Sequence, residues 1–158
     1  MGKVCAFFGR RDVFIREDKK ELQEKLTQVV KILIEKEGVD RFYVGGHGDC
    51  DFLAGQVTHA LKKEYPFIQT WLIMAYGSQL MQKKPLVLFD VFHFPENVER
   101  CKKLFAIPAR NEYMVKQADY VVAYVDFLGG AYKAVKLALK QNKTVINLGS
   151  WDLEEVFD

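Results

Sequence analysis

The stretch "ADYVVAYVDFLGGAYKAVKLALKQNKTVINLG", residues 118–149, decides the fold. Its apolar run at 119–125 is followed by the pair Gly129 and Gly130, by apolar residues at helical spacing, and by a second apolar run. This succession predicts a strand, a tight turn, a helix and a second strand, which together form a βαβ unit. The two glycines fall where the chain leaves the first strand, so we expect the backbone to approach a ligand closely there.

The rest of the chain repeats this alternation. Short apolar runs mark the strands, and apolar residues at three- and four-residue steps mark the helices. The pattern predicts an α/β fold: a single Rossmann-like three-layer domain over residues 1–158, with a mostly parallel, doubly wound sheet of about five strands in the order 3-2-1-4-5. The expected strands span 3–8, 41–46, 68–77, 119–125 and 144–149, and the expected helices span 18–37, 51–65, 109–118 and 130–141.

The composition bounds the class of protein. A chain of 158 residues with 49% apolar content is long enough for one domain with its own core. The 23 basic and 21 acidic residues give a net charge of +2, which does not favour a nucleic-acid partner. No apolar run approaches the roughly 20 residues of a membrane span, so we expect no membrane partner.

The cysteines indicate the compartment. Cys5, Cys50 and Cys101 are far apart and form no CxxC pair, which argues against a disulfide framework or a structural zinc and indicates a reducing cytoplasm. His47 and Asp49 lie beside Cys50, but a matching second cluster is missing from the sequence. We therefore predict neither a metal nor a cofactor.

Three glycine-containing turns are expected at one edge of the sheet. They leave the first, second and fourth predicted strands, and doubly wound sheets bind ligands at that carboxyl edge, where the strand order reverses. Backbone amides and the positive end of a helix suit a phosphate, whereas the alternative role of each turn is only to reverse the chain. The predicted ligand contacts are Gly9, Arg10, Arg11, Gly45, Gly46, Gly48, Asp51, Arg110, Asn111, Gly129, Gly130 and Ala131.

Each charged residue in this set has an alternative role. Arg10 and Arg11 suit bidentate phosphate contacts or are solvated surface charges. Arg110, expected with Asn111 to open a short helix, contacts the ligand or forms a salt bridge across the helix start. Asp51 caps the helix that follows it or accepts a hydrogen bond from a ribose hydroxyl.

Four blocks in order carry a family resemblance. They are "CAFFGRRD" at 5–12, "FYVGGHGDCDFLA" at 42–54, "AIPARNEYMVKQADYVVAYV" at 106–125 and "GGAYKAVKLALKQNKTVINL" at 129–148. The chain resembles the SLOG superfamily, the Rossmann-like group that includes the Smf/DprA proteins and the LOG nucleotide phosphoribohydrolases. It is most similar to the small stand-alone SLOG proteins of bacteria and their phages. The resemblance implies a pocket for a nucleotide or a nucleotide-derived molecule.

The resemblance departs from the family at two positions. Small SLOG proteins usually carry a His-Arg pair after the first glycine, so Arg10 departs from that pattern while Arg11 keeps it. The LOG enzymes carry a Gly-Gly-x-Gly-Thr-x-x-Glu block, and counting from Gly129 places Lys136 at the position of the glutamate. A cation cannot stabilise an oxocarbenium-like centre as a carboxylate does, so we expect binding rather than catalysis.

The predicted function is binding of a nucleotide or nucleotide-derived small molecule, for sensing or sequestration, at the carboxyl edge of the sheet. One alternative is a nucleotide phosphoribohydrolase or N-glycosidase related to the LOG enzymes. The other is single-stranded DNA binding like that of Smf/DprA, which the balanced charge does not favour. A homo-oligomer is expected, because "PLVLFDVFHFP" at 85–95 is too apolar for a solvated loop and the LOG relatives are dimers.

Overall fold

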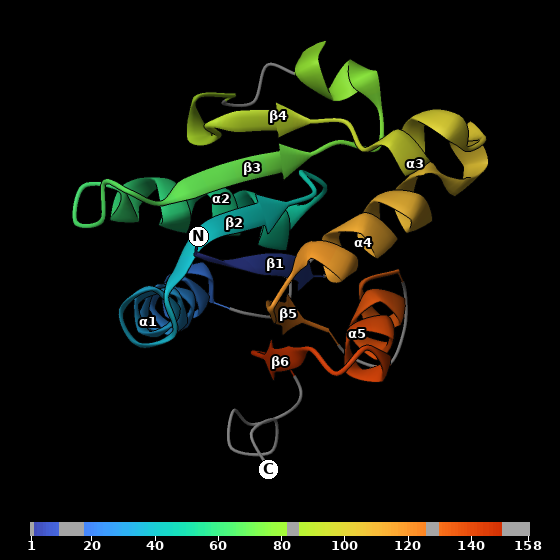
Figure 1. The fold of residues 1–158 in the computed structure, drawn as a ribbon. Helices are drawn as coiled ribbons and strands as arrows, with labels where there is room; N and C mark the ends of the chain where they lie inside the picture. The colour runs from blue at the N-terminus through green and yellow to red at the C-terminus, as the bar shows by residue number, and fades with distance from the viewer. Residues whose placement is uncertain (1, 10–17, 82–85, 126–129, 150–158) are drawn as a thin grey trace.

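A six-stranded parallel sheet forms the centre of the protein in the computed structural model, which describes residues 2–9, 18–81, 86–125 and 130–149 (Figure 1). The strand order is β4-β3-β2-β1-β5-β6, and every neighbouring pair is parallel. The strands are β1 (Lys3–Gly9), β2 (Val39–Val44), β3 (Gln69–Ile73), β4 (Val91–His93), β5 (Tyr120–Tyr124) and β6 (Thr144–Asn147).

The predicted strand order is confirmed, with one strand added. The five expected strands correspond to β3-β2-β1-β5-β6, so the order reverses between β1 and β5 as predicted. The sheet has six strands rather than about five because β4 extends it beyond β3. β4 is only three residues long, which is too short to produce a recognisable alternation of apolar and polar residues.

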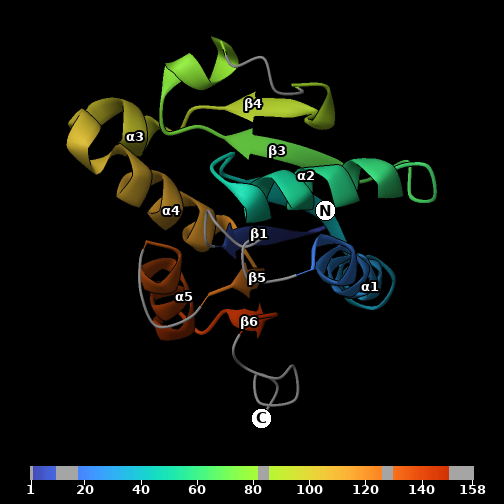
Figure 2. The ribbon, with the colours of Figure 1, turned by 180° about the vertical axis from the view of Figure 1, so that it is seen from behind.

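Helices cover both faces of the sheet and give the predicted three layers (Figures 1 and 2). One core lies between the sheet and the first two helices, and it contains Phe7 and Phe42. The other lies between the sheet and the last two helices, and it contains Phe8 and Tyr43. The helices are α1 (Lys19–Glu37), α2 (Asp49–Leu61), α3 (Glu96–Arg100), α4 (Ala106–Gln117) and α5 (Gly130–Lys140), with 3-10 turns η2 (Gly77–Met81), η3 (Leu86–Leu88) and η4 (Lys103–Phe105).

α1 is capped at both ends. Asp18 accepts hydrogen bonds from the backbone N–H groups of Lys20 (2.8 Å) and Glu21 (3.1 Å), which satisfies amides of the first turn. Gly38 ends the helix with a left-handed backbone, φ 75°. Both ends therefore match the expected span of 18–37.

The start of α4 differs from the prediction. The helix begins at Ala106, so Arg110 and Asn111 lie in its second turn instead of opening it. Pro108 is tolerated because it falls in the first turn, where a backbone N–H has no partner within the helix. The earlier helix start matters because Arg110 then lies within hydrogen-bond distance of the turn that follows β2.

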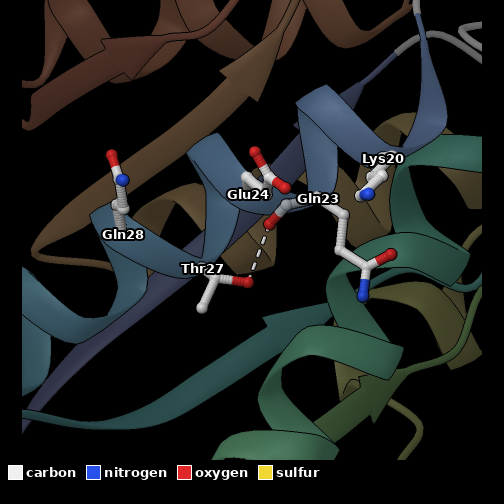
Figure 3. Close-up of a pocket in the computed structure, with 5 residues that line it drawn as sticks. All are labelled: Lys20, Gln23, Glu24, Thr27 and Gln28. Carbon is white, nitrogen blue, oxygen red and sulfur yellow. Dashed lines mark hydrogen bonds between the residues drawn. The ribbon is translucent and has the colours of Figure 1, made fainter.

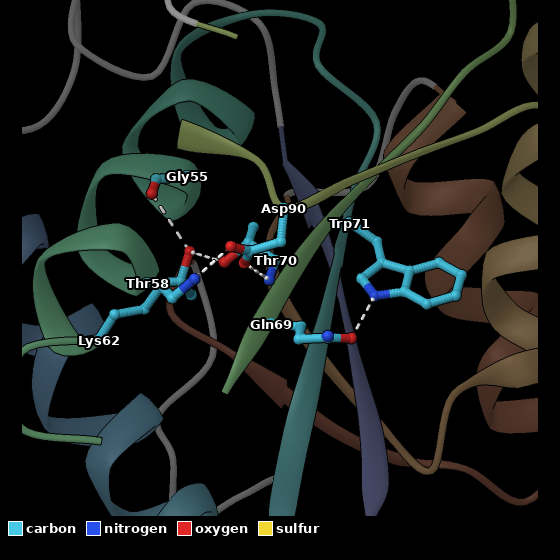
Figure 4. A network of polar contacts seen from close by, with 7 residues as sticks. All are labelled: Gly55, Thr58, Lys62, Gln69, Thr70, Trp71 and Asp90. Carbon is cyan, nitrogen blue, oxygen red and sulfur yellow. Dashed lines mark hydrogen bonds and ion pairs between the residues drawn. The ribbon is translucent and has the colours of Figure 1, made fainter. Parts of the chain in front are cut away.

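A polar network at the amino end of β3 attaches the edge strand to the domain (Figure 4). The buried Thr70 donates from Oγ1 to Oγ1 of the buried Thr58 (2.9 Å) and from its backbone N–H to Oδ2 of Asp90 (2.8 Å). Lys62 pairs with the other carboxylate oxygen of Asp90. This network lies at the end of the sheet opposite to the glycine turns.

Candidate nucleotide-phosphate site at the carboxyl edge

Two buried side chains donate hydrogen bonds to the turn after β2. Arg110, which is 4% exposed, donates from Nη1 to the carbonyl oxygen of Gly45 (2.8 Å). Gln79, which is 3% exposed, donates from Nε2 to the same oxygen (3.0 Å). The Oε1 atom of Gln79 accepts from the backbone N–H groups of Ala75 (2.8 Å) and Tyr76 (3.2 Å). Three segments distant in sequence are thus joined at one carbonyl.

His47 in this turn is fixed in one tautomer. Its Nδ1 lies 2.8 Å from Nη1 of Arg110, and arginine has only donors, so Nδ1 must accept and the ring proton is on Nε2. The ring also makes an edge-on contact with Tyr76, with 6.3 Å between the centroids. His47 and Tyr76 therefore present an aromatic pair at the carboxyl edge.

The first turn of α2 is acidic. Gly48 is the N-cap and provides no side-chain cap, while Asp49 and Asp51 occupy the first turn. The buried carboxylate of Asp51 accepts from the backbone N–H of His47 (2.9 Å), so it bonds backward to the turn and the predicted cap of residues 52–56 is wrong. Because the two carboxylates already complement the helix dipole, this helix end is poorly suited to an anion.

Glycine is required at three of these positions by close contacts within the protein. A Cβ at Gly9 would lie 2.2 Å from Sγ of Cys50, so this glycine lets β1 approach α2. A Cβ at Gly45 would lie 2.7 Å from Cζ of Arg110. Gly46 has φ 77°, and a Cβ there would lie 2.6 Å from a methyl carbon of Leu72.

The N-terminus of α5 differs from that of α2 in having no acidic first turn and no tightly packed glycine. Gly130 is exposed, a Cβ there would meet no atom of the described chain within 4 Å, and its φ is not positive. No acidic residue lies in the first turn, which continues through Ala131 and Tyr132. The positive end of a helix attracts anions, so this helix start is suited to a phosphate.

The structure brings together only part of the predicted set. Gly9, Gly45, Gly46, Gly48, Asp51 and Arg110 gather around one turn, and Asn111 joins them because its Oδ1 accepts from Nε of Arg110 (3.2 Å). Gly130 and Ala131 lie at the start of α5 on the same edge. Arg10, Arg11 and Gly129 lie outside the described residues.

Gln79 was not predicted as a member of this site. It falls in the aperiodic segment after β3, where a glutamine has no signature that distinguishes it from a surface residue. Tyr76 lies near the end of the expected strand 68–77, and its ring was considered only as one of several that could stack a base. His47 was weighed only as a metal ligand. The described residues contain no group of three or more His, Cys, Asp and Glu side chains arranged to hold a metal ion.

The cysteine beside the site is not reactive. Burial raises the pKa of the Cys50 thiol well above its usual range, and the neighbouring charges of Asp51 and Asp49 raise it further. The thiolate is the nucleophilic form, so this side chain packs as a small apolar group against Gly9. Cys5 is likewise buried, with its pKa raised by the same desolvation.

A separate hollow of about 490 Å³ lies on α1 (Figure 3). Its described walls come from that helix alone, where Oγ1 of Thr27 donates to the carbonyl oxygen of Gln23 (2.7 Å). The lining side chains mix one cation and one anion with amides, so they offer neither a charged nor an aromatic binding surface. The lining residues are Lys20, Gln23, Glu24, Thr27 and Gln28.

The parallel sheet in doubly wound order, covered by helices on both faces, defines the class as a Rossmann-like α/β protein. The solved structure of DNA processing protein A (DprA) from Streptococcus pneumoniae matches all of this chain with a TM-score of 0.66 and 18% identity. The DprA structure from Helicobacter pylori, described by its single-stranded DNA binding mode, matches 98% with a TM-score of 0.61 and 16% identity. These likenesses confirm the predicted resemblance at the level of the fold.

Among individual proteins, the chain is similar to the uncharacterised SPbeta prophage-derived protein YoqJ of Bacillus subtilis. The two are 27% identical over an alignment of 157 positions, and the match covers 87% of this chain and 90% of that protein. The chain spans 54% of the pneumococcal DprA and 70% of the Helicobacter pylori DprA. No family model matches the chain. In the part of the chain that the structure describes, no helix has the length and apolar character to cross a membrane.

Proposed function

We propose that the protein binds a nucleotide phosphate at the carboxyl edge of the sheet, with the phosphate at the N-terminus of α5. The observation that carries this proposal is the open first turn of α5, which combines an exposed Gly130 with the absence of any acidic residue. It follows β5, next to the reversal of strand order where doubly wound sheets bind ligands.

The aromatic pair His47 and Tyr76 supports a nucleotide rather than an inorganic anion. Both side chains lie at the same edge, on the other side of β1 from α5. An imidazole with its proton on Nε2 is a hydrogen-bond donor, and a tyrosine ring offers a stacking surface for a base. Arg110 and Gln79 position this pair by donating hydrogen bonds to the Gly45 carbonyl. We assign phosphate binding to neither residue.

Single-stranded DNA is the form of nucleotide that we favour as ligand. The specific observation is the fold likeness to two DprA proteins, one of which is described by its binding of single-stranded DNA. A free nucleotide-derived molecule, for sensing or sequestration, is the second candidate, because the open turn of α5 suits the phosphate of either. In both cases the ligand is bound and not hydrolysed, since the position of the LOG glutamate holds the exposed Lys136.

Fluorescence anisotropy with a labelled oligothymidylate, and calorimetric titration with thymidine monophosphate, test the proposal. Mass spectrometry of small molecules released from the denatured purified protein extends the test to ligands that co-purify. We expect saturable binding that weakens as salt is added. Absence of binding to both probes, together with absence of a retained phosphorylated molecule, would contradict the proposal.

A further inference from the structure

α5 carries a lysine stripe, defined as Lys133, Lys136 and Lys140. All three side chains are exposed. At 3.6 residues per turn they lie within about 60° of one another around the helix axis. The buried residues Ala134, Val135 and Ala138 face the opposite way, toward the sheet. The stripe therefore runs along the outer surface of the helix.

Among the described residues, no ion pair compensates the charge of the stripe. Residues 130–149 contain four lysines and no aspartate or glutamate. Within the described chain, the three stripe lysines form no ion pair; Lys136 instead lies over the ring of Tyr132, with 5.4 Å between Nζ and the ring centroid. A positive surface of this kind costs the folded state some self-repulsion and attracts a polyanion.

Lysines of α1, in contrast to those of α5, lie close to acidic residues. Lysines and glutamates alternate along α1, where Lys25 lies 3.8 Å from Glu21 and Lys31 lies 3.2 Å from Glu64. The balanced net charge of +2 thus conceals a local separation of charge. The sequence-based argument against nucleic acid used the net charge and could not include this separation.

We infer that the lysine stripe binds the phosphodiester backbone of a single strand whose first phosphate lies at the N-terminus of α5. The inference rests on the proposed function. At a rise of 1.5 Å per residue, Lys140 lies about 15 Å along the axis from Gly130, so the stripe extends away from the carboxyl edge by the length of several phosphates. Exposed lysines contact phosphates as point charges without reading sequence.

The triple variant Lys133→Gln, Lys136→Gln, Lys140→Gln tests this inference. Each neutralised phosphate on a single strand contributes about 0.7 to the slope of log affinity against log salt, so losing three contacts lowers the slope by about 2. We expect affinity for an oligothymidylate of about 20 nucleotides to fall about tenfold at low salt. Binding of thymidine monophosphate should not change, because it reaches only the helix end.

The matched control is the triple variant Lys25→Gln, Lys31→Gln, Lys36→Gln on α1, which removes the same charge from the other face. We expect it to retain the wild-type salt slope. An unchanged slope in the α5 variant, or an equal loss in both variants, would overturn the inference. Failure of the wild-type protein to bind both probes, together with the absence of a retained phosphorylated molecule, would instead overturn the proposed function, so the two failures are distinguishable. Circular dichroism checks that each variant is folded.

Discussion

The turn at 45–48 before α2 and the first turn of α5, which begins at Gly130, both contain glycine at the carboxyl edge, but their surroundings differ. The first is occupied from within: Arg110 and Gln79 hold its carbonyl, and Asp51 holds the N–H of His47. In the second, Gly130 is exposed with no described atom within 4 Å of a Cβ, and the helix has no acidic residue in its first turn. A glycine turn therefore indicates a close approach of the backbone to other atoms. Only the surrounding side chains show whether those atoms belong to the protein itself.

This difference assigns the predicted site residues to two roles. Gly9, Gly45 and Gly46 serve contacts within the protein, and Arg110 supports the turn. Gly130 has no such contact in the described chain. Substitutions at the first turn should therefore act on stability, and substitutions at the second should act on the ligand.

Arg110→Ala should have the largest effect on stability. It removes a buried, charge-assisted hydrogen bond to Gly45 and leaves Nδ1 of His47 without this donor. We expect the free energy of unfolding to fall by about 3 kcal/mol, measured by urea denaturation. The control is Arg100→Ala, whose exposed side chain pairs with Glu96 and should contribute under about 0.5 kcal/mol. Equal stability of the two variants would contradict the role of Arg110 in stabilising the turn after β2.

Gly46→Ala should cost about 2 kcal/mol of stability. The substitution forces a side chain into a positive φ and brings its Cβ against Leu72. Gly77→Ala is the control on the same edge, because a Cβ there meets no described atom within 4 Å and φ is not positive. Thermal unfolding compares them, and a Gly46→Ala protein as stable as wild type would contradict the assigned strain.

Thr58→Val separates stability from binding at a position remote from both turns. It leaves the buried hydroxyl of Thr70 without its acceptor, which should cost about 1 to 2 kcal/mol (Figure 4). Because this network lies at the amino end of β3, affinity for a nucleotide should not change in the folded protein. A loss of affinity measured by calorimetric titration would show that stability alone controls binding.

Gly130→Ala should have the smallest effect on stability and the opposite sign. At a non-positive φ with open space around the Cβ, replacing glycine by alanine restricts the unfolded chain and stabilises the protein by about 0.4 to 1 kcal/mol. Differential scanning calorimetry should record a higher Tm. A lower Tm would indicate that Gly130 serves the turn, as Gly46 does.

Most of the fold follows from patterns that are local in the sequence. The caps of α1 at Asp18 and Gly38 are set by a side chain and a φ that the neighbouring residues fix, so they could be predicted. β4 could not, because its three residues become a strand only by pairing with β3. The start of α4 at Ala106 was missed because a proline two residues later obscures a helix beginning.

The site was predicted less completely because its residues meet only in three dimensions. The glycine turns could be placed at one edge from strand order alone. Gln79 is 34 residues from Gly45 in the sequence, and Arg110 is 65 residues from it. No sequence motif can therefore predict either hydrogen bond. The sequence therefore located the edge, while the structure shows which of its residues make contacts within the protein.

Titration of the Gly130→Val variant with the labelled oligothymidylate tests the central claim most directly. The substitution fits the fold, since a Cβ at this position meets no described atom, but its branched side chain occupies the space that a phosphate needs beside the first amides of α5. We predict that the variant unfolds at or near the wild-type temperature and loses at least tenfold in affinity, about 1.4 kcal/mol, while Gly77→Val binds as wild type does. Wild-type affinity in a folded Gly130→Val protein would contradict the assignment of the phosphate to this helix.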